Sequence, residues 1–96
     1  MKRDAIAIKD GDNVATALRD LKAGETALVG IGDAAATVTM AGAVEFGHKL
    51  ALVAIRRGED ILKYGEVIGR ATEDIPRGAH VHVHNIESLR GRGDLA

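Results

Sequence analysis

Three of the four histidines in the chain fall within five residues, in the run His80-Val81-His82-Val83-His84-Asn85. On a β-strand, alternate side chains face opposite sides, so the three imidazoles would share one face and the two valines the other. Neighbouring imidazoles, about 6.5–7 Å apart at the backbone, could converge on one metal ion or one anionic ligand. The outer pair, His80 and His84, would begin about 13 Å apart, which disfavours one ion bound by all three. The pattern favours a ligand-binding face; the alternative is a solvent-facing strand that uses histidine.

The fourth histidine lies in a short polar segment, Gly47-His48-Lys49, which is expected to begin a strand. Its glycine permits a close approach to a ligand, its imidazole can act as an acid, a base or a metal ligand, and its lysine supplies a cation. The segment Lys63-Tyr64-Gly65 is comparable, because a cation and a phenol could hold a carboxylate. The alternatives are an ordinary surface pair after a glycine turn, and a tyrosine that serves as a core side chain. Residue types alone therefore predict a polar face suited to an anionic, oxygen-rich small molecule, with or without a divalent metal.

Composition argues against several other kinds of site. The chain of 96 residues carries 13 basic and 14 acidic side chains, a net charge of −1, so it lacks the basic excess that nucleic-acid binding needs. It has no cysteine, which excludes disulfides, thiol catalysis and zinc–thiolate sites. No apolar stretch approaches the ~20 residues that span a bilayer, and the N-terminus lacks a signal-peptide pattern. We therefore expect a cytoplasmic protein with neither a nucleic-acid nor a membrane partner.

The elements that position these side chains are expected to be short strands in a single domain spanning residues 1–96. Twelve glycines against one proline fit many short strands linked by tight turns. A stripe of apolar residues after a cap at Asp12 or Asn13 predicts one short helix through Asp20. Residues 91–96 are expected to form a polar tail. Apolar alternation or apolar runs predict strands at 4–9, 26–31, 36–40, 49–55, 61–64 and 81–86.

A loose internal echo accompanies these strands. The segments 20–24, 54–58 and 74–78 share the form x-[LI]-x-x-G, with an apolar residue three positions before a turn glycine. Because the chain between them does not repeat, they indicate recurring turns of one small barrel-like or clip-like sheet and not a solenoid.

From Gly47 onward, the order of these motifs resembles that of a known family. The motifs are Gly47-His48-Lys49, Ile61-Leu62-Lys63-Tyr64-Gly65, Ile68-Gly69 and Val81-His82-Val83-His84-Asn85. The opening, with Asp12-Asn13-Val14-Ala15 before Gly24, is similar too, so that the likeness covers roughly residues 5–90. The chain is thereby identified as resembling the amino-terminal SAF-type domain of the altronate/galactarate dehydratase family. This resemblance implies a mostly-β, SAF-type β-clip fold with one or two short helices.

Proteins of this family carry a much larger catalytic domain after the small one, and some relatives, such as (2R)-sulfolactate sulfo-lyase, are similar enzymes split into subunits. The resemblance thus implies a small subunit that needs a separate large catalytic subunit. The implied reaction is β-elimination from a 2-hydroxy acid to a 2-oxo acid, assisted by a divalent metal, iron or manganese.

Carried onto this sequence, the resemblance implies site residues at seven positions. His48, His82 and His84 are the expected metal ligands or acid/base groups; His80 lies outside the recurrent part of the motif and ranks lower. The expected substrate-binding residues are Lys49, Lys63, Tyr64 and Asn85, of which Asn85 would bond a substrate hydroxyl or orient a histidine.

Three functions stay open at this point. The first is a sugar-acid dehydratase of the altronate or galactarate type, and the second is sulfolactate sulfo-lyase, in which sulfite leaves in place of water. The third is a non-catalytic binding or assembly module, because SAF-type domains also occur in that role. A short chain with an aliphatic core also hints at homo-oligomers, since paired small domains bury more surface.

Overall fold

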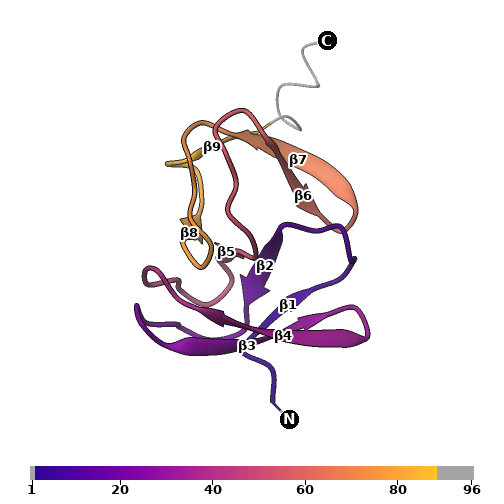
Figure 1. Ribbon diagram of the computed structural model, residues 1–96, viewed down its shortest axis with the longest axis vertical. Coiled ribbons are helices and arrows are strands. Elements are labelled where there is room, and N and C mark those ends of the chain that lie inside the picture. The colour runs from indigo at the N-terminus through magenta and orange to yellow at the C-terminus, as the bar shows by residue number, and fades with distance from the viewer. Residues whose placement is uncertain (1, 89–96) are drawn as a thin grey trace.

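A computed structural model describes residues 2–88, and all the regular elements in this part of the chain are strands (Figure 1). They are β1 (Ala5–Ala7), β2 (Val14–Ala17), β3 (Thr26–Ile31), β4 (Ala34–Thr39), β5 (Lys49–Ala51), β6 (Asp60–Lys63), β7 (Glu66–Ala71), β8 (His80–Val81) and β9 (Ile86–Ser88). The predicted mostly-β fold is confirmed. No helix of the described residues is long and apolar enough to cross a membrane.

The strands form two sheets. A six-stranded sheet has the order β4-β3-β1-β2-β5-β8, in which only β1 and β3 run parallel, and a three-stranded antiparallel sheet has the order β6-β7-β9. Figure 1 shows the long β3–β4 hairpin at one end of the molecule and the three-stranded sheet towards the other. The strand β8, which carries the first of the clustered histidines, is an edge strand paired to β5.

Two aliphatic clusters form the core. Small alanines in the larger cluster let strands pack closely, while Val, Leu and Ile fill the remaining volume. The smaller cluster joins the end of β5 and the edge strand β8 to the three-stranded sheet. Its members are Val14, Ala51, Ile55, Ile61, Ala71, Ile75 and Val81.

A five-residue pattern that ends in a turn glycine occurs four times and directs the chain into β3, β5, β6 and β8. In each copy a tight turn of four residues follows the apolar residue, and glycine is the third residue of the turn. The turn is closed by a hydrogen bond from the N–H of its fourth residue to the C=O of its first residue. Those glycines have φ between +82° and +90°, a conformation that side chains disfavour. Three copies match the predicted x-[LI]-x-x-G form, and the fourth, at 43–47, has valine in place of leucine or isoleucine. The apolar residues pair across the fold, Leu21 with Val44 and Ile55 with Ile75.

These turns matter for function because two of them end beside histidines. The turn Glu45–His48 closes with a 2.9 Å bond from the His48 N–H, and β5 begins at the next residue. The turn Pro76–Ala79 closes in the same way, and β8 begins with His80. The fold therefore brings His48 and His80 to neighbouring strands through equivalent turns.

Two predicted elements are wrong. The helix expected from Asp12 or Asn13 to Asp20 is replaced by the strand β2, because Val14–Ala17 pairs with β1 on one side and β5 on the other. The strand expected at 81–86 is divided: β8 ends at Val81, a turn follows, and β9 begins at Ile86. Val83, predicted to share a strand face with Val81, is 78% exposed as a result, whereas Val81 is buried. The predicted strands at 4–9 and 49–55 are also shorter in the structure, and the predicted polar tail at 91–96 lies outside the described residues.

A buried carboxylate joins the two sheets. Asp12, 6% exposed, accepts hydrogen bonds from the backbone N–H groups of Lys9, Tyr64 and Gly65, so it links the β1–β2 turn to the β6–β7 turn. Burial works to raise the pKa of this carboxyl, but the amide donors outweigh it and the net pKa lies below the ordinary value of 3.8. The neighbouring Asn13 makes two further side-chain bonds, to the backbone of Asp60 and Leu62 in β6.

We expect Asp12→Ala to lower the free energy of unfolding by about 2–3 kcal/mol, because it leaves buried amides without an acceptor. A group with a depressed folded-state pKa contributes stability above its unfolded pKa, and this stability is lost as the pH falls through the lower folded value. The wild type should therefore lose this contribution only below about pH 4. Urea unfolding between pH 3 and pH 7 measures both effects. The exposed Asp10→Ala is the control, and equal destabilisation by the two changes would contradict the role given to Asp12.

Candidate metal centre

The pairing of β5 with β8 brings the histidines together. The register sets Lys49 opposite Val81 and Leu50 opposite His80, and continuing it by one pair places His48 opposite His82. Directly opposed residues of an antiparallel pair point to the same face, so the imidazoles of His48, His80 and His82 gather on one side of the sheet edge.

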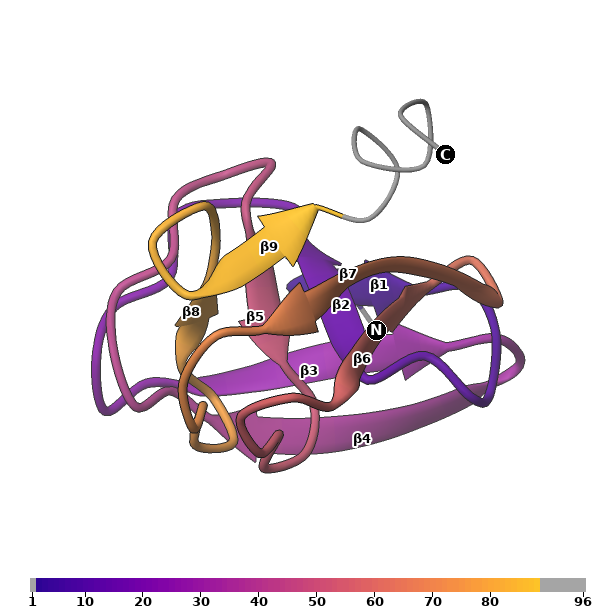
Figure 2. The same ribbon diagram turned by 90° about the horizontal axis from the view of Figure 1, so that it is seen from above.

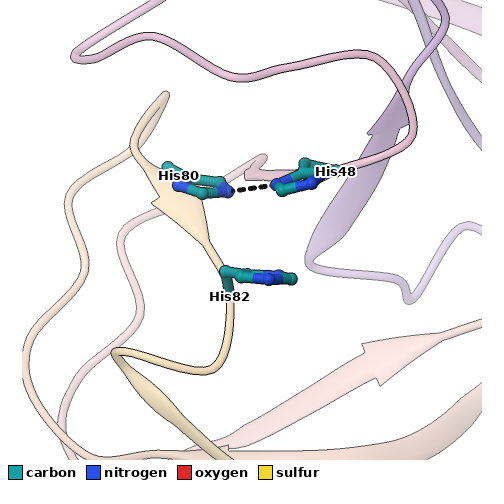
Figure 3. Close-up of side chains that lie close together, drawn as sticks. All are labelled: His48, His80 and His82. Atoms are coloured by element: carbon teal, nitrogen blue, oxygen red, sulfur yellow. Dashed lines mark hydrogen bonds between the residues drawn. The ribbon is translucent and has the colours of Figure 1, made fainter.

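Figure 3 shows how the three rings lie. His48 Nδ1 and His80 Nε2 approach to 2.9 Å, and His82 stacks on His48 with ring centroids 4.5 Å apart and planes inclined by 22°. One ligand nitrogen from each ring lies within 4.8 Å of the other two. All three side chains are half-buried, which leaves the cluster open to solvent on one side. We call these three residues the histidine cluster.

The donor set of the histidine cluster fits a transition-metal ion. With metal–nitrogen bonds of about 2.1 Å, two imidazole nitrogens on one ion lie about 3.0–3.4 Å apart, close to the 2.9 Å that separates His48 and His80. The His82 nitrogen lies within 4.8 Å of these two, so its ring would have to rotate to bind the same ion. In the absence of an ion, the short contact is a hydrogen bond in which one imidazole donates and the other accepts. Imidazole ligands suit iron and zinc better than magnesium or calcium.

Asn85 fixes the backbone of the cluster. It is 4% exposed; its side-chain oxygen accepts a 2.9 Å bond from the His82 N–H, and its amide donates a 2.8 Å bond to the His80 carbonyl. Both polar ends of Asn85 therefore close the turn between β8 and β9. The Asn85 side chain is buried, and both its oxygen and its amide bond backbone groups. The structure therefore favours the role of orienting the histidines over that of binding a substrate hydroxyl.

His84 lies beside the cluster without joining its ligand set. Its ring centroid is 5.2 Å from that of His80, with planes inclined by 41°, and its side chain is exposed. The predicted ligand set of His48, His82 and His84 is thus only partly brought together, and His80, ranked lower from the sequence, takes the third position. The sequence ranks His80 lower because it lies outside the recurrent motif. In the structure a turn at 82–85 interrupts the expected strand alternation, and His84 falls outside the ligand set. Asn85 was the available signal, since asparagine favours turns.

The surroundings of His80 and His82 lower the pKa of both side chains. Burial, followed by the neighbouring His48 and His84, lowers the pKa of His80, and burial and His48 likewise lower the pKa of His82. The charge of Glu45 opposes both shifts, so this carboxylate lies near the cluster. Imidazoles that stay neutral at pH 7 keep the lone pairs that a metal ion needs.

Lys49 lies close enough to the cluster to influence it. Burial, then the positive charge of Lys63, lowers the pKa of Lys49, and Lys49 in turn lowers the pKa of His82. Of the two expected substrate-binding lysines, Lys49 therefore lies near the histidines, whereas Lys63 ends β6 beside Tyr64.

Tyr64 is not brought to the cluster. It occupies the β6–β7 turn with φ +57°, and its ring, 55% exposed, lies 5.0 Å from the Lys63 ammonium. In Figures 1 and 2 this turn lies on the opposite side of the molecule from β8. Its exposure also excludes the core-anchor alternative.

A shallow hollow of about 430 Å³ lies elsewhere, lined by Lys2, Arg3, Leu18 and Arg19. Arg19 is already paired with Asp4 and Glu25 at 3.0 Å and 2.6 Å. The hollow contains no acid/base or metal-binding side chain, so the candidate chemistry stays at the histidine cluster.

The fold and site define a small β module that presents three imidazoles and Lys49 at a sheet edge. The sequence pattern of the altronate/galactarate dehydratase SAF domain matches residues 3–89, and the chain belongs to this family. This confirms the resemblance first drawn from the motif order.

Curated relatives agree with this placement. Altronate dehydratase of Bacillus subtilis is 41% identical over 83 residues, which are 86% of this chain and 16% of that protein. Altronate dehydratase of Escherichia coli is 47% identical over 74 residues, 77% of this chain and 14% of that protein. The (2R)-sulfolactate sulfo-lyase subunit alpha of Chromohalobacter salexigens is 44% identical over 48 residues, which are 50% of this chain and 51% of that protein. The chain thus spans only a small part of the dehydratases that it matches.

We expect His80→Ala to weaken metal binding by at least about 100-fold, because it removes a ligand, whereas His84→Ala should change it much less. Titration of each variant with Co(II), followed by its absorption bands, and with Fe(II) under argon measures the difference. A larger loss of metal affinity for His84→Ala than for His80→Ala would contradict this ligand set and support the one predicted from the motif.

Asn85→Ala should weaken metal binding by about 10–100-fold, because the turn no longer holds two of the imidazoles. Asn13→Ala is a matched control, since Asn13 also makes two side-chain bonds to backbone but far from the cluster. Both changes should lower the free energy of unfolding by about 1–3 kcal/mol, and only Asn85→Ala should affect the metal. Metal titrations and thermal melts on the same samples separate the two effects, and equal metal affinity in both variants would refute the positioning role.

Proposed function

We propose that this chain is the small subunit of a dehydratase that removes water from a sugar acid of the altronate or galactarate type, together with a separate large subunit. The observation that carries the proposal is the convergence of His48, His80 and His82 in a module of this family. The reaction converts a 2-hydroxy acid to a 2-oxo acid: the C2 proton is removed, the C3 hydroxyl leaves, and the enol formed becomes the ketone.

The three clustered imidazoles would hold a divalent metal, for which iron suits nitrogen ligands better than manganese does. When bound, such an ion supplies Lewis acidity, which makes the C2 proton of a 2-hydroxy acid more acidic. Iron or manganese remains the expected identity.

The other residues of the chain orient the substrate and handle protons. Lys49 and Lys63 neutralise the substrate carboxylate, and their positive charges favour a developing enolate. An imidazole that binds a metal has committed its lone pair, so His84, which lies outside the ligand set, is the imidazole of this chain left to accept or return a proton. Asn85 acts through the histidines that it positions.

The large subunit is proposed from the length comparison. The dehydratases that this chain matches are about six to seven times longer than the matched segment, since it covers 16% and 14% of them. The remaining part of such an enzyme would supply the pocket for the sugar chain.

The alternative is the small subunit of (2R)-sulfolactate sulfo-lyase, with sulfite as the leaving group. The observation that favours it is the match to two proteins named as subunit alpha of that enzyme, of which the matched segments cover 51% and 70%. A non-catalytic binding or assembly module is the remaining alternative, and a cluster that binds metal without any turnover would favour it.

The test is to purify the tagged chain with its partner and assay elimination under argon with added Fe(II) or Mn(II). We expect a 2-oxo acid from altronate or galactarate, and a loss of at least about 100-fold in kcat for His82→Ala. Sulfolactate serves as the competing substrate, and release of sulfite identifies the alternative. The absence of turnover with every substrate and metal would rule out both enzymes.

A further inference from the structure

The two most exposed large apolar side chains of the described residues stand next to the histidine cluster. Val83 is 78% exposed and directly follows His82, while Phe46 is 66% exposed and lies two residues before His48. Exposed apolar residues scattered singly are ordinary, but two that bracket a polar site suggest a contact surface. We call Phe46 and Val83 the apolar rim.

Both rim residues sit on turns that hydrogen bonds hold in place. The Phe46 N–H donates a 2.8 Å bond to the Asp20 carboxylate, within the turn that closes at His48. The turn that carries Val83 is closed by the buried Asn85. In Figures 1 and 2 the loop leading into β5 and the β8–β9 turn lie on the same side of the molecule. Because the backbone of both turns is held this way, little backbone freedom is lost on binding, which suits the two residues to act as anchors.

The site between the rim residues is chemically one-sided. It offers imidazoles and the cation Lys49, whereas Glu45 is the carboxylate whose charge reaches His80 and His82. The half-buried cluster also stays open to water on one side. A partner that covers it must therefore bring acidic or oxygen groups at the centre and apolar pockets at the margin.

We propose that Phe46 and Val83 are the anchors by which this module docks onto the large subunit, with the histidine cluster facing into the interface. The inference rests on the proposed function, which supplies the occupant. In relatives named altronate dehydratase, the matched segment is 16% and 14% of the chain, so a much larger body accompanies the module there. The active site then forms between two chains, and neither contains all of it.

The experiment compares two double variants of the full chain. The rim variant is Phe46→Ser with Val83→Ser, and the control is Ile8→Ser with Val53→Ser, two apolar side chains 44% and 51% exposed. Ile8 directly follows β1. Val53 comes after the last residue of β5, whereas His48 precedes its first residue. The probe is the larger chain that tagged wild-type protein recovers from its native cells, accepted only if mass spectrometry identifies it as similar to the remainder of altronate dehydratase.

We expect the rim variant to bind this chain at least about 30-fold more weakly than the wild type by titration calorimetry, and the control to remain within about threefold. Metal binding and the thermal melt should be unchanged in both, because neither pair contributes a ligand. Since serine in place of an exposed side chain seldom prevents folding, the melt also verifies that the variant is intact.

The outcomes separate the two proposals. Wild-type affinity in the rim variant overturns the docking surface and leaves the proposed function standing. Rim-dependent binding in a complex that turns over no 2-hydroxy acid supports the surface and overturns the proposed function. If the wild type recovers no chain of this kind, the occupant is wrong and the inference fails with it.

Discussion

The antiparallel pairing of β5 with β8 is the contact on which the candidate site depends. The pairing covers only two residue pairs, yet its register decides that three imidazoles share one face. A slip by one residue would turn His80 and His82 to the opposite face and place Val81 among the polar groups. Strands this short do not fix a register by themselves, so it must come from their surroundings: Val81 and Ala51 are fully buried in the smaller core cluster, and the tight turns before each strand deliver the chain at a set position.

Three polar side chains, of which Asp12 and Asn85 are buried, fix backbone positions in an otherwise aliphatic fold. Asp12, Asn13 and Asn85 each bond backbone groups and not other side chains. Asp12 and Asn13 fasten the β6–β7 hairpin to the larger sheet, while Asn85 fastens the histidine turn. Because a buried polar group without its partner is costly, each of these bonds disfavours alternative registers more than it adds to net stability.

Sequence patterns correctly predicted the elements that local contacts determine. They failed for the elements that contacts between distant parts of the chain determine. Thr26–Ile31 was predicted to the residue, since an apolar strand followed by a glycine turn is a short-range signal. Val14–Ala17 read as a helix because valine and alanine repeat at helical spacing, but pairing with strands on both sides outweighs that preference. Alternating histidine and valine predicts a strand, whereas Asn85, a residue type that favours turns, is the signal in the run for the turn that the structure shows. The members of the site could thus be named from their types, whereas the promotion of His80 over His84 required the fold.

Under the proposed function, the chemistry of a three-imidazole ligand set explains why this module would need a partner. Each imidazole that binds a metal gives up the lone pair with which it would remove a proton, and the lowered pKa values of His80 and His82 keep those nitrogens available as ligands at neutral pH. The cations Lys49 and Lys63 attract a carboxylate but do not act as bases while charged. This leaves the exposed His84 as the imidazole of the chain free for proton transfer, at the rim of the site and 5.2 Å from His80 between ring centroids. A base in that position becomes effective only when a second surface holds the substrate against it and excludes water, because proton transfer needs contact at hydrogen-bond distance.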